Sequence, residues 1–427
     1  MTVPIHFLFT LWEGGGNVTP TLEVVRKLVG RGHRVRFMSD TCNRAEAETV
    51  GAAFVPWNRA PSRPDRKRDS QGFKDWAEAT PQGGLLSVIR DVWCGPSLAY
   101  ARDVVDELRR EPADVVVSSE CLFGVMAGCE SVGQRFVTLA PNISLAPVPG
   151  VPPLGPGLPP ARTDDERALH AKIANGTREM FDAGLPALNA TRTALGLAPL
   201  AHLTDQYQAA ERELLATSAA FDFPSDPLPS RIRYVGPQIA DPAWVRPWTS
   251  PWAASDERPL VVVAFSTTFQ NHVGVVQNVI DALATLPARV LVTLGGSLEP
   301  DEVHAGANCV VVESAPHTIV MREAALLVTH GGHGTVMRGL VSRVPMLVIP
   351  HGRDQNDNAV TERGAGLSLV PDASVDAIRT ACDRLLREPQ FRAAAKRLGD
   401  LVAADADAST VVAELEASCA DPLCAAT

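Results

Sequence analysis

Short apolar runs rich in valine, isoleucine and leucine recur along the chain, and helix-like stretches separate them. They fall at residues 5–11, 34–38, 115–118 and 136–139, and again at 260–265, 289–293, 310–312, 326–329 and 346–349. Runs that are continuous in apolar residues are typical of strands buried on both faces, as in a parallel sheet covered by helices. The pattern predicts an α/β protein in which this arrangement occurs twice.

A segment without helical or strand period separates the two sets of runs. It follows Val235, Gly236 and Pro237 and carries further prolines up to Pro259. A length of 427 residues suits two domains, each large enough for its own core. We therefore place an N-terminal domain at 1–237, a linker at 238–258, a C-terminal domain at 259–400, and an alanine-rich helical tail at 401–427 that is able to pack back on the N-terminal domain.

The net charge and the spacing of the cysteines limit the classes of partner and the cellular compartment that we expect. Thirty-nine Lys and Arg against 49 Asp and Glu give a formal net charge of -10, which repels nucleic-acid phosphates and anionic lipid surfaces. The apolar stretch 5–12 is too short for a membrane span, and no small-residue cleavage site follows it. Eight cysteines are scattered without paired spacing, which indicates reduced thiols. We expect a soluble cytoplasmic protein with neither nucleic acid nor membrane as partner.

Two segments of the first half fit no regular element. Residues 60–69 read APSRPDRKRD and predict a charged surface loop. Residues 147–160 hold seven prolines and three glycines, too many for a helix or a strand. The second segment is either a connector or a wall of a ligand site, because loops at strand ends are where α/β proteins hold ligands.

The most informative motif lies in the second half. A strand ending at Thr329 is followed by His-Gly-Gly-His-Gly-Thr at 330–335 and then by a helix. Glycines between a buried strand and a helix N-terminus let the backbone approach a ligand, and the free amides and helix dipole favour an anion such as a diphosphate. The next strand ends in a polar cluster at 351–358, which the adjacent strand end brings to the same edge. These two turns predict a phosphate site with carboxylate and amide groups beside it.

These motifs resemble a known family, the inverting glycosyltransferases of family 1 with the two-domain GT-B fold, in the branch that glycosylates antibiotics and other natural products. The matching segments are 330–335, 344–350, Asp354-Gln355, Asn358-Ala359, 364–366 and the Tyr-Val-Gly-Pro at 234–237. The resemblance covers nearly the whole chain. It implies two Rossmann-like domains facing each other across a cleft, with the acceptor bound by the first and a nucleotide-sugar donor by the second.

The resemblance also implies a donor site. His330 and the amides of Gly331, Gly332, Gly334 and Thr335 would hold the diphosphate, Asp354 and Gln355 would bind sugar hydroxyls, Ser266 and Thr267 would touch the phosphates, and His317 would contact the nucleoside. Plant relatives carry a ribose-reading glutamate where this chain has Arg338, which tilts the expectation slightly toward a dTDP-sugar over a UDP-sugar. Ser314 replaces a frequent tryptophan of the family, which removes a stacking plane.

The catalytic base departs from the family pattern. The family's histidine in the first loop is replaced by Asn17, which cannot accept a proton at working pH but can orient a hydroxyl or bind the acceptor. The partner aspartate is replaced by Ser119. Either a neighbouring carboxylate is the base, with Glu13 as first candidate and Glu120 as second, or the acceptor is acidic enough to need little help. His272 is a third candidate.

Aromatic residues of the first half suggest a flat, apolar acceptor, for which the candidates are Trp12, Trp76, Trp93 and Phe123. Because amides, the helix dipole and His330 would meet the phosphate charge, we expect no metal and no cofactor besides the nucleotide-sugar co-substrate. The leading function is inverting transfer of a sugar to a hydrophobic small molecule. A nucleotide-sugar epimerase and a noncatalytic partner of a true transferase remain alternatives, as does assembly into a homodimer.

Overall fold

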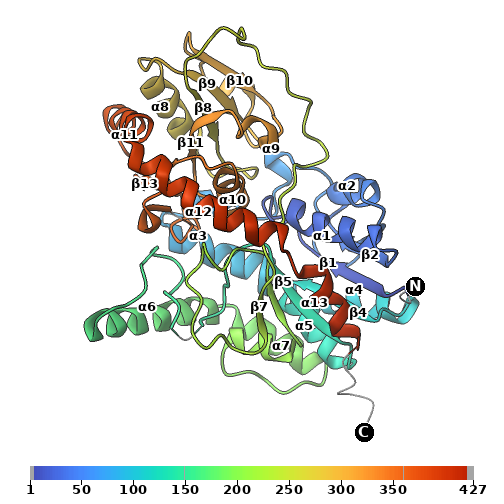
Figure 1. Cartoon of the computed structure of the whole chain (residues 1–427). Helices are drawn as coiled ribbons and strands as arrows, with labels where there is room; N and C mark the ends of the chain where they lie inside the picture. Colours follow the sequence, from blue (N-terminus) through green and yellow to red (C-terminus); the bar gives the residue numbers. More distant parts are fainter. Residues whose placement is uncertain (1–3, 149, 359, 421–427) are drawn as a thin grey trace.

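The computed structural model describes residues 4–148, 150–358 and 360–420 and contains two parallel sheets, one in each half of the chain (Figure 1). The first sheet has the strand order β3-β2-β1-β4-β5-β6-β7. Its strands are β1 His6–Thr10, β2 Arg34–Ser39, β3 Ala53–Pro56, β4 Val115–Ser119, β5 Phe136–Ala140, β6 Glu213–Leu215 and β7 Ile232–Tyr234. The expected twofold α/β architecture is confirmed.

The second sheet has the order β10-β9-β8-β11-β12-β13. Its strands are β8 Leu260–Ala264, β9 Arg289–Thr293, β10 Cys309–Val312, β11 Ala324–Thr329, β12 Met346–Val348 and β13 Gly366–Ser368. In each sheet the strand order reverses beside the first strand, β1 or β8. Loops that follow the strands on either side of such a reversal diverge and leave a crevice for a ligand.

Helices cover both sheets. In the first half they are α1 Val18–Gly30, α2 Arg44–Thr49, α3 Pro81–Val88, α4 Ser97–Arg110, α5 Phe123–Ser131, α6 Asp164–Asp182 and α7 Leu185–Ala194. In the second half they are α8 Val273–Leu283, α9 His317–Val320, α10 His333–Val341, α11 Val375–Arg387, α12 Pro389–Asp407 and α13 Val411–Ala420. Shorter turns of helix are η1 Thr41–Asn43, η2 Arg68–Ser70, η3 Asp75–Ala77, η4 Ile89–Cys94, η5 Leu203–Ala209, η6 Pro300–Glu302 and η7 Val360–Arg363. No helix in these described ranges is long and apolar enough to cross a membrane.

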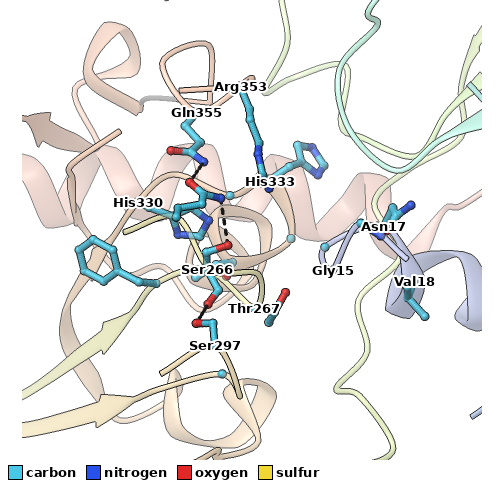
Figure 2. A pocket seen from close by; sticks show the side chains of 18 of the residues that line it. Gly15, Asn17, Val18, Ser266, Thr267, Ser297, His330, His333, Arg353 and Gln355 are labelled. Carbon is cyan, nitrogen blue, oxygen red and sulfur yellow. Dashed lines mark hydrogen bonds between the residues drawn. The ribbon is translucent and has the colours of Figure 1, made fainter. Parts of the chain in front are cut away.

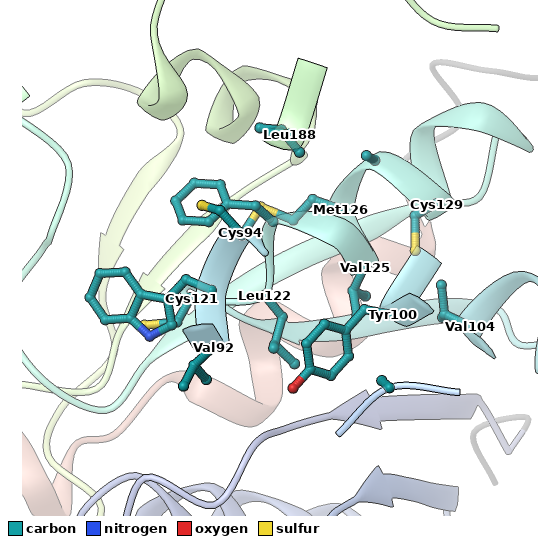
Figure 3. Close-up of a cluster of buried hydrophobic side chains, with 14 of the residues drawn as sticks. Val92, Cys94, Tyr100, Val104, Cys121, Leu122, Val125, Met126, Cys129 and Leu188 are labelled. Atoms are coloured by element: carbon teal, nitrogen blue, oxygen red, sulfur yellow. The ribbon is translucent and has the colours of Figure 1, made fainter. Parts of the chain in front are cut away.

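The N-terminal core is tightest where α5 meets α4 (Figure 3). A side chain at Gly124 would place its first carbon 2.2 Å from the carbonyl oxygen of Ser97, so only glycine allows this approach. Phe123, at the start of α5, is fully buried with its ring 5.4 Å from that of Tyr207. The prediction that Phe123 contacts an acceptor is therefore wrong, because the ring faces the protein core.

Two segments cross between the domains, and they lie against each other. The first is the segment between β7 and β8, and the second is the junction between α12 and α13. Gln238 Nε2 donates to Ser409 Oγ at 2.9 Å, and Ser409 Oγ donates to the carbonyl of Val235 at 2.7 Å. Beyond this junction α13 packs on the N-terminal domain, where Leu415 is fully buried and Glu416 lies 2.9 Å from Arg31.

Candidate active site

A cavity of about 1020 Å³ lies between the two domains and is lined by residues of both. This volume is at the upper end of the range for small-molecule sites. Figure 2 shows Ser266, His330 and Gln355 of the C-terminal domain on one side and Gly15 and Asn17 of the N-terminal domain on the other. The loops that line it follow strands near the reversals of both sheets, where the strand order predicts a ligand site.

The glycine-rich turn joins β11 to α10, as the sequence predicts. Within it, His330, Gly332, Gly334 and Thr335 line the cavity. Gly331 does not, because its amide donates to Thr329 Oγ1 at 3.3 Å. Its φ of +92° and its approach to the carbonyl of Gln355 show that Gly331 shapes the turn, which corrects its expected contact with a diphosphate.

His330 is a neutral group in this structure. Burial lowers the pKa of its imidazole well below the usual value, and the neighbouring His351 and His272 act in the same direction. The ring stacks on Phe265 with centroids 6.1 Å apart. A neutral imidazole can still donate one hydrogen bond to an anion, so the positive field of this turn comes from the N-terminus of α10.

The loop after β12 contributes Asp354 and Gln355 to the cavity. Asp354 accepts a hydrogen bond from Asn358 at 2.7 Å, and burial raises the pKa of its carboxyl. The Gln355 side chain accepts from the amide of His351 at 2.6 Å and donates to Gln270 at 2.9 Å. Asp354 therefore keeps one oxygen available for a ligand hydroxyl, whereas Gln355 braces the loop.

His317 lies at another part of the cavity, where the linker also contributes. Its Nε2 is 3.0 Å from Thr293 Oγ1, and burial lowers its pKa to about 4. Arg338 donates to the carbonyl of Ala240, and its Nε is 3.8 Å from Asp241. Asp241 and Trp244 line the cavity, and the sequence analysis missed both because a linker without periodicity gives no sign of where it packs.

The loop after β1 brings the two domains into contact. Asn17 donates to the carbonyl of Trp12 at 3.0 Å and accepts from the amide of Gly14 at 3.2 Å, so its side chain is used in shaping the turn. Gly15 has a φ of +80°, and a side chain there would place its first carbon 2.6 Å from Thr267 Oγ1. Only glycine permits this close approach between the domains.

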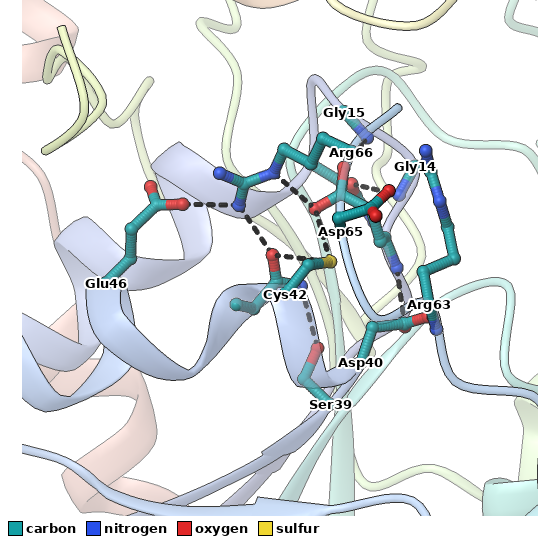
Figure 4. Close-up of polar contacts among 12 residues, drawn as sticks. Gly14, Gly15, Ser39, Asp40, Cys42, Glu46, Arg63, Asp65 and Arg66 are labelled. Atoms are coloured by element: carbon teal, nitrogen blue, oxygen red, sulfur yellow. Dashed lines mark hydrogen bonds and ion pairs between the residues drawn. The ribbon is translucent and has the colours of Figure 1, made fainter. Parts of the chain in front are cut away.

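Glu13, the first candidate for the base, is held in a polar network, of which Figure 4 labels Gly15, Glu46 and Arg66. Its carboxylate accepts from the amide of Gly15 at 2.8 Å and from Arg66 Nε at 3.0 Å, and Arg66 also pairs with Glu46. Only 2% of Glu13 is exposed. Segment 60–69 is therefore not a plain surface loop, since Arg66 reaches inward and lines the cavity.

Glu120, the second candidate, follows β4 and lines the cavity beside Trp12 and Cys121. Its side chain accepts a hydrogen bond from Ser119 Oγ at 3.5 Å and, within the described residues, forms no ion pair with an arginine, unlike that of Glu13. Burial raises its pKa to about 8, with the charge of Glu213 acting in the same direction. Glu120 is thus a carboxyl that can take up and release a proton near neutral pH.

His272 does not reach the cavity. It is 1% exposed, stacks on Phe265 and has its Nε2 3.4 Å from Ser297 Oγ. Burial lowers its pKa to about 3. The proposal of His272 as a base is corrected, because the ring is part of the core of the C-terminal domain.

Three of the four predicted acceptor residues do line the cavity. Trp93 stacks on Phe181 with centroids 6.0 Å apart, and Trp12 meets Phe73 edge to face. Trp76 packs edge to face on Phe269 of the C-terminal domain. These rings form an apolar part of the cavity wall.

Comparisons with known proteins agree with this geometry. Residues 277–418 match the family described as erythromycin biosynthesis protein CIII-like, C-terminal domain. The chain is 29% identical over 405 residues to 4'-demethylrebeccamycin synthase of Lentzea aerocolonigenes, covering 92% of this chain and 94% of that protein.

Among solved structures, the glycosyltransferase of kitacinnamycin superposes with a TM-score of 0.75 at 20% identity, covering 98% of this chain and all of that one (100%). The glycosyltransferase VinC in complex with dTDP superposes with a TM-score of 0.64 at 20% identity, over 97% and 100% of the two chains. Both share the two-domain fold. The chain is therefore similar to these glycosyltransferases in fold, and its residues 277–418 are similar to the erythromycin biosynthesis protein CIII-like C-terminal domain.

Proposed function

We propose that this protein is a glycosyltransferase that moves a sugar, with inversion, from a nucleoside diphosphate to an apolar small-molecule acceptor, without a metal ion. The observation that carries this proposal is that one cavity has two different walls. One wall holds the N-terminus of α10 at His333, and the other holds Trp12, Trp93 and the protonatable Glu120. An anion and an apolar ring system can occupy these walls at the same time.

The donor is a dTDP-sugar in this proposal. Arg338 stands where a ribose-reading carboxylate would favour a 2'-hydroxyl, and its guanidinium is used in holding the linker carbonyl of Ala240. The similar structure VinC binds dTDP. Asp241, 3.8 Å from Arg338, is the carboxylate that could instead favour a UDP-sugar, so the two nucleotides need direct comparison.

Glu120 is the proposed base, ahead of Glu13. Both Glu13 oxygens accept hydrogen bonds from Gly15 and Arg66, which lowers its capacity to accept an acceptor proton. Glu120 faces the cavity with a pKa of about 8 and so can remove a proton from an attacking hydroxyl. On the opposite wall, the amides of Gly334 and Thr335, the α10 dipole and His330 would stabilise the diphosphate as it leaves.

We place the enzyme in the cytoplasm, in keeping with the seven described cysteines, all of which are thiols. Assembly into a homodimer stays a prediction that light scattering of the purified chain can check. We propose flat aromatic aglycones as the acceptors, because the stacked rings of Trp93 and Phe181 on the acceptor wall can pack against a flat ring.

The proposal is tested by calorimetric titration with UDP and with dTDP in the presence of a chelator. We expect dTDP to bind more tightly than UDP, and the chelator to change neither affinity. Binding of UDP alone would reverse the donor assignment, and binding of neither would overturn the donor site. Transfer from dTDP-glucose to resorufin, a flat and acidic aromatic phenol, then tests the reaction, and analysis of the anomeric configuration of the product tests inversion.

A further inference from the structure

The loop that carries Asp354 and Gln355 also holds the acceptor domain, by contacts that the donor chemistry does not require. Asp357 accepts hydrogen bonds from the amides of Gly155 at 2.8 Å and Gly157 at 2.9 Å. Asn356 donates to the carbonyl of Gly155 at 3.0 Å. These contacts join the proline-rich segment 147–160 of the N-terminal domain to the loop at 351–358 of the C-terminal domain. We call this loop, which carries Asp354 and Gln355, the sugar loop.

The glycines of this segment fit the contact closely. Gly155 and Gly157 have φ values of +120° and +67°, and their two amides, on either side of Pro156, donate to the same carboxylate. A side chain at Gly157 would place its first carbon 2.5 Å from the carbonyl oxygen of Asn356. Burial raises the pKa of Asp357 to about 7, and Asp354 and Asp222 face it as like charges, so the two amides are the partners that favour its ionised form.

The clasped segment is part of the acceptor wall. Leu154 and Gly155 line the cavity, whereas Asp357 does not. Leu154 packs against the apolar clusters of both domains, and its carbonyl accepts from Thr177 of α6 at 3.3 Å. The position of Leu154 therefore depends on a residue that lies three positions after Asp354 and touches neither proposed substrate.

We propose that Asp357 is a positioning residue that clasps the loop around Gly155 and Gly157 onto the sugar loop and so closes the acceptor end of the cavity. This proposal rests on the proposed function and adds a residue that couples the two substrates. Closing the loop places Leu154 against the acceptor and excludes water from the donor sugar.

The contact is tested first by hydrogen exchange in the full chain at about pH 8, above the Asp357 pKa of about 7. In the wild type the amides of Gly155 and Gly157 are expected to be protected, and in Asp357→Ala their exchange should rise at least about tenfold. Glu166→Ala is the matched control, since Glu166 also accepts two backbone amides, from Arg162 and Thr163, but within its own domain. Equal exchange in the wild type and Asp357→Ala, or the same rise with Glu166→Ala, would overturn the clasp.

The role in acceptor binding is tested with dTDP-glucose and resorufin. Asp357→Ala should raise the resorufin KM about tenfold and increase hydrolysis of the donor by water relative to transfer, while the affinity for dTDP changes less than about twofold. Gly157→Ala should behave alike, because its new carbon displaces the same loop from the other side. An unchanged KM with a freed loop would contradict the positioning role. Should the wild type transfer to no acceptor, the proposed function fails, whereas the exchange result still decides whether the clasp exists.

Discussion

The two walls of the cavity are built in different ways. The donor wall comes from two short loops, which follow the neighbouring strands β11 and β12, and it presents backbone amides and a few polar side chains. The acceptor wall comes from many separate segments, including the β1 loop, η3, η4 and α6, and it presents aromatic rings. A wall of backbone held by a sheet has little freedom to vary, whereas a wall of side chains on loops can change without disturbing the core. The proposed donor site is thus built mainly from backbone, and the proposed acceptor site mainly from side chains.

The strongest test of this contrast is Glu120→Gln, which removes the proposed base from the acceptor wall and leaves the donor wall intact. Transfer to an apolar secondary alcohol should fall roughly 10²- to 10⁴-fold, and an acidic phenol such as resorufin should lose much less, because it ionises without help. The wild-type rate should rise with pH through about 8, since the base works deprotonated. The variant should lose this rise in a pH profile of kcat/KM.

Glu213→Gln is the matched control for that experiment. Glu213 is a buried carboxyl whose charge raises the pKa of Glu120, and it does not line the cavity. Loss of its charge should lower the pKa of Glu120, so the rate on the alcohol above about pH 8 should stay close to the wild-type value while the rise with pH moves to lower pH. A pH profile that stays unchanged in Glu120→Gln would remove Glu120 from the mechanism.

The next largest effect is expected on the donor wall. His330→Ala should weaken dTDP binding roughly tenfold to hundredfold, the value of one hydrogen bond to a charged group, as measured by calorimetry. Because the pKa of His330 lies well below its usual value, dTDP affinity should not change between about pH 6 and 8 through this group. Unchanged affinity in the variant would show that the phosphate lies elsewhere.

Gly15→Ala tests the point where the walls meet. The added carbon would lie 2.6 Å from Thr267 Oγ1 at a φ of +80°, so the domains must move apart or the backbone must strain. We expect a loss of about 1 to 3 kcal/mol in the free energy of unfolding, measured with urea. Gly16→Ala is the control, because nothing lies within 4 Å of its added carbon. Equal losses in both would show that the closeness to Thr267 is not the cause.

The smallest effect is expected for Glu13→Gln. Its carboxylate binds Arg66, which retains Glu46 and is partly exposed, so unfolding should become easier by only about 1 kcal/mol. The transfer rate should stay within roughly threefold of the wild type, measured on the same alcohol as Glu120→Gln. A steep loss of rate without loss of stability would return Glu13 to the role of base.

Much of the fold could be predicted from the sequence because its long strands are continuous in apolar residues. The runs at 289–293 and 115–118, for example, coincide with β9 or lie within β4. The strands β3, β6, β7 and β13 escaped prediction because each has only three or four residues, and β6 and β7 carry the charged residues Glu213 and Arg233. Such strands form because a neighbouring strand offers its edge, which is tertiary information.

The residues expected at the donor wall belong to local motifs, whereas the polar contacts of the other wall do not. His330, Asp354 and Gln355 come from local motifs whose strand–turn–helix context is visible along the chain. By contrast, the contact between Glu13 and Arg66 joins residues far apart in sequence. Nothing in the sequence distinguishes Phe123, which faces the core, from Trp93, which faces the cavity.

The hydrogen bonds that join the two crossover segments at Ser409 determine how the domains can move. Because Val235, Gln238 and Ser409 are hydrogen-bonded together, the domains are joined along one line by two parallel segments instead of by a single flexible tether. Two connections that lie along one line allow the domains to rotate about that line alone. Opening and closing of the cavity are then described by one angle. Release of the proposed glycoside product would then be a rotation of the domains about this axis. A chain that ends before α13 would lose the second connection, and its domains would rotate about more than one axis.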